Sequence, residues 1–143
     1  MKEALYYEKT GNLNVRCLLC PHHCVISPGR TGICRVRTNI EGALYTLNYG
    51  AVSSIHLDPI EKKPLYHFYP GSRIISAGTL GCNLSCSFCQ NYSISQIPST
   101  ESELHFKRYT YSMSPEDIAR KAKKEEKNGN IGVSYTYNEP SIW

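Results

Sequence analysis

The chain has 143 residues, 41% of them hydrophobic and 20% charged, a composition typical of a folded globular protein rather than of a disordered one. Its net charge of +4 is too small to indicate a nucleic-acid partner. No apolar run is long enough for a membrane span, and the first residues lack the pattern of a secretory signal. Seven cysteines are an odd number, so they favour metal binding in a reducing cytoplasm over a disulfide framework.

Residues 1–70 are predicted to form a small β-rich module. Short alternating stretches at 5–8 and 13–16 flank a glycine-containing turn, which is the pattern of a β-hairpin. Residues 33–38 and 43–49 repeat this pattern around a second glycine-containing turn. We therefore expect two hairpins in this module.

Four cysteines lie between the two predicted hairpins, with the spacing C-x2-C-x3-C-x9-C: Cys17, Cys20, Cys24 and Cys34. Four thiols on loops can close one metal site, which would add folding free energy to a short module. The metal is either zinc or a second iron–sulfur cluster, and free thiols are the remaining alternative. Four arginines crowd this group, and they either offset the charge of a thiolate-rich site or form a recognition patch: Arg16, Arg30, Arg35 and Arg37.

Residues 50–70 are rich in proline, and we interpret them as a polar connecting loop. They contain residues that could instead form a catalytic acid/base set: His56, Asp58, Glu61 and His67. The turn-forming pair Pro70-Gly71 marks the predicted boundary with a second domain, residues 71–143.

A β-branched run at 73–79 fits a buried strand, and it leads directly into Gly-Cys-Asn-Leu-Ser-Cys-Ser-Phe-Cys-Gln-Asn. The three cysteines of this loop, Cys82, Cys86 and Cys89, have the spacing C-x3-C-x2-C. Thiolates this close together can bind one iron–sulfur cubane and leave its fourth iron without a protein ligand. The alternatives are a half zinc site completed elsewhere and a structural iron–sulfur loop. Gly78 and Gly81 would let a ligand approach the backbone closely.

The rest of the chain predicts a second strand and the helix that connects to it. We expect a short strand near 104–109. Ser114 and Pro115 then provide the cap and the first residue of a helix that runs to about residue 128. Residues 131–137 follow as a strand, which we expect to be parallel to 73–79 because a helix joins them.

The cysteine loop, with Phe88 directly before its third cysteine, resembles the radical S-adenosylmethionine (SAM) superfamily. In that family the open iron is chelated by SAM, and one electron from the reduced cluster cleaves SAM to a 5′-deoxyadenosyl radical. The resemblance implies a catalytic 4Fe–4S cluster on Cys82, Cys86 and Cys89, with SAM as cofactor. It also implies an electron donor such as ferredoxin or flavodoxin, and contact between Phe88 and the adenine.

The segment after the last predicted strand, Tyr137-Asn138-Glu139-Pro140, is similar to the Gly-Gly-Glu-Pro segment of glycyl-radical-activating radical SAM enzymes. In those enzymes the segment holds the SAM amino group. Glu139 and Pro140 match it, whereas Tyr137 and Asn138 replace the two glycines. The resemblance implies that Asn138 and Glu139 bind the cofactor. The alternative for Glu139 is a carboxylate that caps a neighbouring structural element.

Several motifs together resemble one subfamily, the radical SAM enzyme of the AmmeMemoRadiSam system, which is similar to pyruvate formate-lyase activating enzyme. They are C-x2-C-P-x2-C, G-x-C-R-V-R, D-P-I-E-K-K-P-L-Y-H-F at 58–68, the cysteine loop and Y-N-E-P. The family fold implies an α/β chain: the start of a partial (β/α) barrel preceded by a small β-rich four-cysteine metal-binding module. Because this chain ends just past the second predicted strand, we expect an N-terminal fragment of a longer enzyme.

The functional hypothesis is a radical SAM oxidoreductase that, like glycyl-radical activases, removes a hydrogen atom from a glycine of a partner protein. One alternative is a radical SAM enzyme that modifies a small molecule or another macromolecule. A two-cluster iron–sulfur electron-transfer protein is an alternative from a different class, although the second cysteine group lacks a fourth thiol. A zinc-binding nucleic-acid module built on the first four cysteines is another. The sequence does not identify the substrate or the oligomeric state.

Overall fold

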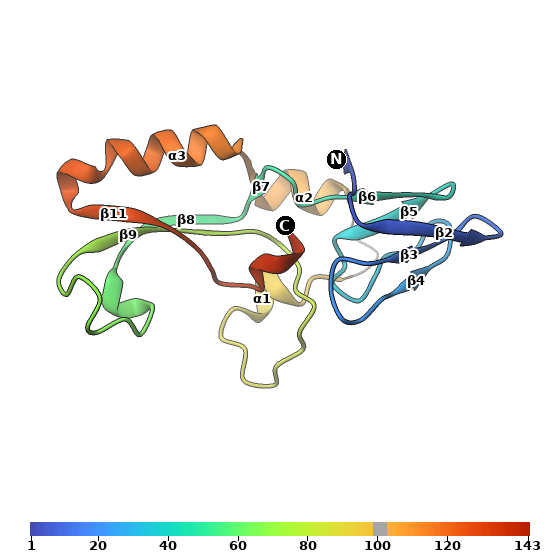
Figure 1. The fold of residues 1–143 in the computed structure, drawn as a ribbon, viewed down its shortest axis with the longest axis horizontal. Coiled ribbons are helices and arrows are strands. Elements are labelled where there is room, and N and C mark those ends of the chain that lie inside the picture. Colours follow the sequence, from blue (N-terminus) through green and yellow to red (C-terminus); the bar gives the residue numbers. More distant parts are fainter. Residues whose placement is uncertain (99–102) are drawn as a thin grey trace.

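The structure is a computed structural model of the chain, and it describes residues 1–98 and 103–143. In this part the fold is mixed α/β, with four small sheets. Figure 1 shows the N-terminal strands gathered at one end of an elongated molecule and the helix α3 with strands β8, β9 and β11 at the other. The short helix α1 (Tyr92–Ser95) lies between the two ends, beside a loop that projects from the middle of the molecule.

The N-terminal end consists of two antiparallel three-stranded sheets, and both predicted hairpins are present. The first sheet has the order β2 (Tyr7–Gly11), β3 (Asn14–Cys17) and β4 (Val25–Ile26). The second has the order β1 (Lys2–Glu3), β6 (Ala43–Thr46) and β5 (Arg37–Ile40). β5 begins later than expected, because Arg35 takes a left-handed backbone conformation (φ +65°) that breaks the extended chain. Val15, Ile26 and Leu44 form the core between the two sheets.

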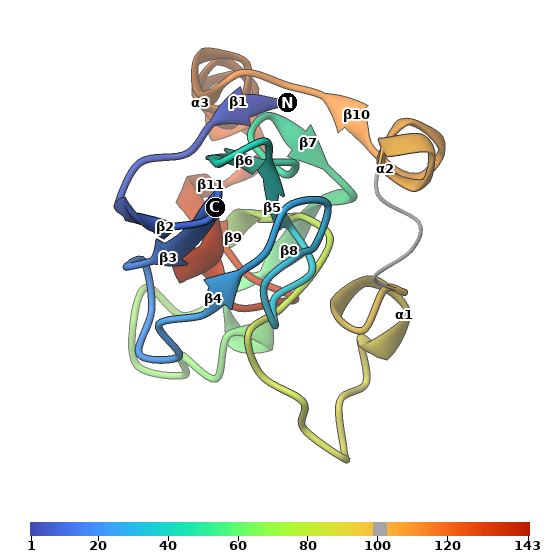
Figure 2. The ribbon, with the colours of Figure 1, turned by 90° about the vertical axis from the view of Figure 1, so that its right-hand side faces the viewer.

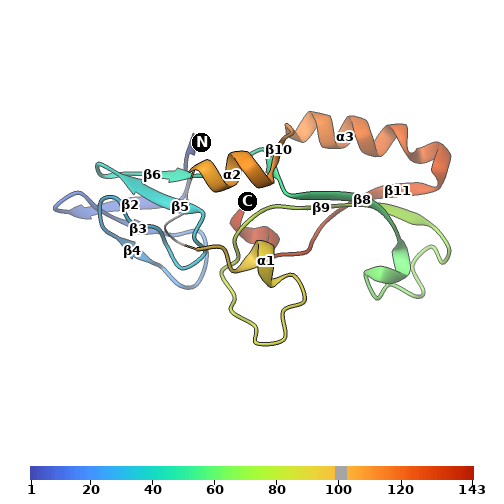
Figure 3. The ribbon, with the colours of Figure 1, turned by 180° about the vertical axis from the view of Figure 1, so that it is seen from behind.

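The other end is a three-stranded sheet with the order β11-β9-β8. β9 (Arg73–Gly78) and β11 (Asn130–Tyr135) are parallel, as predicted, and α3 (Pro115–Lys124) connects to β11. Viewed from behind, α3 lies along one face of this sheet (Figure 3).

α3 is fixed at both ends by side-chain hydrogen bonds. Ser114 and Asp117 form a reciprocal capping box at its start, with Pro115 at the first helical position. The helix ends at Lys124 rather than at 128, and a single 3-10 turn, Glu126–Asn128, follows. The buried side chain of Asn130 donates to the Ala122 carbonyl and accepts from the Ile75 amide, so it ties the helix to β9.

Two predictions for the connecting segments are wrong. The stretch interpreted as a polar loop contains β7 (Ala51–Val52) and the six-residue strand β8 (Ser54–Pro59), which pairs antiparallel with β9 along its whole length. The sheet therefore crosses the predicted boundary at residue 70. The expected strand at 104–109 is instead helix α2 (Glu103–Tyr109).

The residues in the last turn of α2 explain why this segment is helical. Lys107 and Arg108 lie there, where the helix dipole favours cations, and Phe106 is buried in the core. α2 leads into β10 (Tyr111–Ser112), which pairs with β7 (Figure 2).

A hydrophobic core joins the N-terminal module to the middle of the molecule. It joins residues of the N-terminal module with residues that flank the cysteine loop and with the C-terminal turn: Cys34, Val36, Leu47, Leu80, Ile97, Phe106 and Ile142. Gly81 lies against this contact, and a Cβ there would come within 2.3 Å of Val36 Cγ1 and 2.5 Å of the Cys34 carbonyl oxygen. The close approach expected at Gly81 is therefore to the N-terminal module rather than to a ligand.

None of the helices in the described ranges is long and apolar enough to cross a membrane.

Candidate functional site

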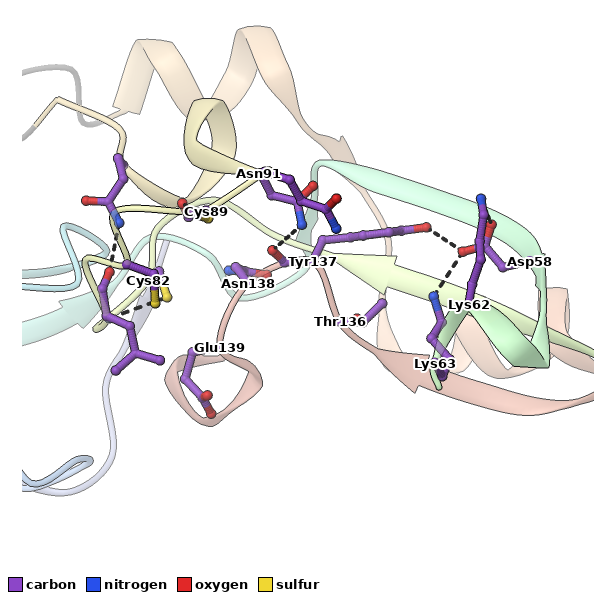
Figure 4. A pocket seen from close by; sticks show the side chains of 15 residues that line it. Asp58, Lys62, Lys63, Cys82, Cys89, Asn91, Thr136, Tyr137, Asn138 and Glu139 are labelled. Carbon is purple, nitrogen blue, oxygen red and sulfur yellow. Dashed lines mark hydrogen bonds and ion pairs between the residues drawn. The ribbon is translucent and has the colours of Figure 1, made fainter. Parts of the chain in front are cut away.

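Strand β9 ends at Gly78 and passes into the cysteine loop, whose three cysteines line one cavity of about 680 Å³. The same cavity is lined by residues from the end of β11 and from the segment after β8 (Figure 4). Both parallel strands thus end at the cavity, as expected for a ligand site at the carboxyl edge of an α/β sheet. The structure brings the predicted cluster loop and the predicted SAM segment together.

The three thiols have different surroundings within this cavity. Cys82 is buried and accepts a hydrogen bond from the Leu84 amide at 3.4 Å, and the Cys89 sulfur lies 3.3 Å from the Ser95 hydroxyl. Cys86 is exposed. N–H and O–H groups directed at sulfur stabilise metal-bound thiolates, so the donor set and its partners fit an iron–sulfur cluster. Across residues 1–98 and 103–143, however, no three His, Cys, Asp or Glu side chains are grouped tightly enough to hold a metal ion, so the cluster stays a prediction.

Phe88 lies outside this arrangement. Its side chain is 87% exposed, and it is not among the residues that line the cavity. Contact between Phe88 and the adenine therefore stays a prediction from the resemblance.

Asn138 lines the cavity, but its side chain forms hydrogen bonds to the backbone around the start of the cysteine loop. Its amide nitrogen donates to the Gly81 carbonyl, and its amide oxygen accepts from the Thr79 amide at 3.3 Å. Asn138 thus ties the segment after β11 to the start of the cysteine loop. Gly78 is needed at the same place, because a Cβ there would lie 2.8 Å from the Tyr137 ring and 2.9 Å from the Thr136 carbonyl oxygen.

Glu139 also lines the cavity, and it performs the alternative role considered for it. One carboxylate oxygen accepts from the Ser141 amide at 3.1 Å and caps the 3-10 turn Pro140–Ile142. A carboxylate has two acceptor oxygens, so Oε2 is available for a cation in the cavity.

A second group of residues also lines the cavity: Asp58, Lys62, Lys63, Asn91 and Tyr137. Asp58 was predicted only as a member of a possible acid/base set and Tyr137 only as a replacement for a glycine, and no site role was predicted for Lys62, Lys63 or Asn91. Asp58 Oδ1 is 3.0 Å from Lys62 Nζ, and Asp58 Oδ2 is 3.0 Å from Lys63 Nζ and 2.9 Å from the Tyr137 hydroxyl. The signal was present in the sequence as the Asp-Pro-Ile-Glu-Lys-Lys run. The run was used only as a family motif, and its residues were not placed at the site because β8 was interpreted as a loop.

The pKa values of this group follow from its contacts. Burial alone would raise the pKa of the Asp58 carboxyl, but hydrogen bonds from Lys63, Lys62 and Tyr137 outweigh it and hold the pKa well below its usual range. Burial, together with the hydrogen bond to the Asp58 carboxylate, raises the pKa of Tyr137 to about 12. At neutral pH the carboxyl is therefore ionised and the phenol is protonated.

The four N-terminal cysteines form a separate group at the end of β3 and in the loops that follow it. Cys17 and Cys34 are buried, and Cys20 and Cys24 are half-buried. Burial raises the pKa of the Cys34 thiol, and the neighbouring Cys17 and Cys24 raise it further. In the described part of the chain these thiols are not grouped tightly enough to hold a metal ion, so a shared metal stays a prediction.

Arg37 lies against the thiol of Cys17 in this group. It is buried, its Nη1 donates to Cys17 Sγ at 3.3 Å, and its Nε has no hydrogen-bond partner. Among the described residues it forms no ion pair with a carboxylate. A buried guanidinium needs a compensating negative charge, and thiolates of a metal site would supply it.

The N-terminal module contacts the cysteine loop directly. His22 Nε2 lies 2.8 Å from the Asn83 carbonyl oxygen, between the first two cysteines of the predicted cluster. Arg35 Nη1 donates to the Gln96 side-chain oxygen at 2.8 Å, and Gln96 Nε2 donates to the Leu84 carbonyl at 2.7 Å. Both contacts fix the backbone of the loop around Cys82.

Comparison with known proteins agrees with this site. Residues 77–143, which include the cysteine loop and β11, match the model of the Radical SAM superfamily. The family implies a 4Fe–4S cluster and SAM as cofactors.

The chain is also similar to a longer protein. It is 45% identical over all 143 residues to a protein of Methanocaldococcus jannaschii described as "Uncharacterized protein MJ0808", and it spans 40% of that relative's length. No solved structure matches the chain.

Proposed function

We propose that the protein to which this chain belongs is a radical SAM enzyme, with its 4Fe–4S cluster on Cys82, Cys86 and Cys89. The observation that carries the proposal is the shared cavity: three thiols and Glu139 line one space at the carboxyl ends of two parallel strands. When bound, the cluster and SAM supply the 5′-deoxyadenosyl radical. Glu139 accepts a hydrogen bond from the SAM ammonium, and Asn138 holds the segment that carries Glu139.

Within this class we propose an activase-like reaction, in which a hydrogen atom is removed from a glycine of a partner protein. The similarity of Y-N-E-P to the Gly-Gly-Glu-Pro segment of such enzymes, and the order of motifs typical of the AmmeMemoRadiSam system, support this assignment. Ferredoxin or flavodoxin is the proposed electron donor. The sheet β8-β9-β11 with α3 is proposed as the start of the partial barrel, with the N-terminal four-cysteine site as structural zinc or a second cluster.

The test uses the full-length protein, reconstituted anaerobically with iron and sulfide. The reduced protein is expected to show the EPR signal of a 4Fe–4S cluster and to convert SAM into 5′-deoxyadenosine. Replacing any one of Cys82, Cys86 and Cys89 with Ala is expected to abolish 5′-deoxyadenosine formation and the signal of this cluster. An unchanged signal in all three variants would refute the assignment. Adding candidate protein partners then tests the activase-like reaction by the appearance of a glycyl radical.

A further inference from the structure

The end of the cavity opposite the cysteines is cationic (Figure 4). Two lysines there share a single carboxylate: Lys62 and Lys63 each place Nζ 3.0 Å from a different oxygen of Asp58. The third partner of Asp58, the Tyr137 hydroxyl, is neutral at physiological pH. Two ammonium groups on one carboxylate leave a net charge of +1 at this end of the cavity.

The two lysines are not equivalent. The Lys63 side chain is only 12% exposed, and its Nζ also lies 5.2 Å from the centre of the Tyr137 ring. The Lys62 side chain is 65% exposed, and it lines the cavity. An exposed ion pair contributes little to stability, and an ammonium in such a pair can turn towards another anion at small cost. Lys63 and Asp58 form the buried ion pair, and Lys62 is the exposed cation beside it.

The position of this group along the sheet separates it from the cysteines. In the pairing of β8 with β9, Ser54 lies opposite Gly78, where the cysteine loop begins, whereas Asp58 lies opposite Ile74. Four residues along a strand correspond to about 13 Å. SAM bound at a cluster on the cysteines has its amino and carboxylate groups at the cysteine end, so the lysines face the region beyond the cofactor.

The surface around Lys62 is polar. Ser54, His56 and Asp58 alternate along β8 and share one face of the sheet. Together with Lys62 and Tyr137 they line an adjoining cavity of about 400 Å³. A site of this kind can satisfy the oxygen atoms of a polar ligand after it leaves water.

We propose that the lysine end of the cavity binds an anionic group, a carboxylate or a phosphate, of the substrate, and that Lys62 makes the contact. The inference rests on the proposed function, because it assigns the cysteine end of the cavity to SAM. An anion there accepts a charge-assisted hydrogen bond from Lys62 Nζ, while Lys63 keeps Asp58 neutralised. The substrate is thereby held beyond the cofactor, along the face of β8.

The experiment titrates the full-length, cluster-containing and SAM-loaded protein by calorimetry with two probes, inorganic phosphate and succinate. The wild type is compared with Lys62→Gln and with Lys124→Gln, a matched change at an exposed lysine of α3 that lines neither cavity. Lys62→Gln is expected to weaken binding of the preferred probe roughly tenfold, whereas Lys124→Gln leaves it unchanged. The stronger of the two probes in the wild type identifies phosphate or carboxylate as the group recognised.

Three results would overturn the proposal. The first is that neither probe binds to the wild type, and the second is that Lys62→Gln binds both probes as tightly as the wild type does. The third is that Lys62→Gln weakens SAM binding instead, which would place the lysine on the cofactor. Iron content and SAM affinity measured in all three proteins separate these results from a failure of the radical SAM assignment, which would show as absent SAM cleavage in the wild type.

Discussion

Tyr137 occupies a backbone conformation that residues other than glycine adopt rarely, with φ of +74°. Three contacts hold it there: its hydroxyl donates to Asp58, its carbonyl accepts from Asn91 at 2.9 Å, and Lys63 lies over its ring. Strained residues persist where the surroundings fix them, and they concentrate at functional sites. Here the fixed conformation directs the next residues, Asn138 and Glu139, towards the cysteine loop.

The contact between Tyr137 and Asp58 predicts that the stability of the folded protein depends on pH. The pKa of Tyr137 is raised from 10.0 to about 12, so the protonated phenol is favoured in the folded state. Its contribution to stability is therefore fully present below pH 10.0 and is lost as the pH rises through about 12. In a spectroscopic titration, the difference in tyrosinate absorbance between the wild type and Tyr137→Phe is expected to appear near pH 12, at the raised pKa of Tyr137. A difference that appears at the ordinary pKa of tyrosine would contradict the hydrogen bond to Asp58.

Glu139→Gln tests the proposed contact with SAM. The variant amide can still accept from the Ser141 amide, so the cap of the C-terminal turn is kept, but the negative charge is lost. SAM binding is expected to weaken roughly ten- to a hundredfold, because a charge-assisted hydrogen bond to the ammonium is removed. Calorimetry on the full-length protein measures this, and iron content serves as the control. Unchanged SAM affinity would return Glu139 to a capping role alone.

At the scale of elements, the cysteine loop is held from outside by the N-terminal module. His22 and the neighbouring His23 are both exposed, but it is His22 that contacts the Asn83 carbonyl, so His23 provides a matched control. Asn is suitable at both positions, since it tolerates the left-handed conformation of His23 (φ +43°) and is too short to replace the His22 contact.

His22→Asn is expected to release iron to a chelator roughly fivefold faster than the wild type, because about one hydrogen bond to the loop is lost. His23→Asn is expected to release it at the wild-type rate. If both variants lose iron equally fast, the effect comes from the N-terminal cysteine group and not from the loop contact.

The elements that could be predicted are those with a local signal. The hairpins at β2–β3 and β5–β6 follow from turn residues, the start of α3 from Ser114 and Pro115, and the parallel pairing of β9 and β11 from the helix between them. Strand β8 was missed because Asp58 and Pro59 are atypical of a strand, and its pairing with β9 is what stabilises it as one. Helix α2 was missed because burial of Phe106 outweighs weak local preference.

The residues of the candidate site also divide into those with a local sequence signal and those without one. The spacing of the cysteines identified the loop, since spacing is a local property. The contacts of Asp58 with Tyr137, and of His22 with Asn83, join residues that are 79 and 61 positions apart, and no local pattern encodes them. Asn138 was assigned to the cofactor from resemblance, whereas its side chain bonds to the Thr79 and Gly81 backbone.

At the scale of the whole molecule, the sheet β11-β9-β8 has two edge strands. Within the described residues β8 and β11 each pair only with the central strand β9. An unpaired strand edge offers hydrogen bonds to a further strand. Because the chain spans 40% of its relative, the edge of β11 is where we expect the remainder of a longer protein to continue the sheet.

The N-terminal sheets form a small unit that has few buried residues of its own, and this predicts a metal at the four cysteines. Modules this small generally need a metal or disulfides in addition to a hydrophobic core. The buried Arg37 beside Cys17, without a carboxylate partner in the described chain, favours thiolates there. We therefore expect Cys17, Cys20, Cys24 and Cys34 to share one metal centre.

A variant of the full-length protein in which Cys82, Cys86 and Cys89 are all Ala isolates this second centre. It is expected to keep about one zinc, or one cluster's worth of iron, per chain by elemental analysis. Adding Cys17→Ala is expected to remove that metal and to destabilise the module, because Arg37 then loses its thiolate partner. The four thiols should also react slowly with a thiol reagent until a chelator is added. Immediate reaction of all four in freshly purified, reduced protein would show that they are free and that the module folds without a metal.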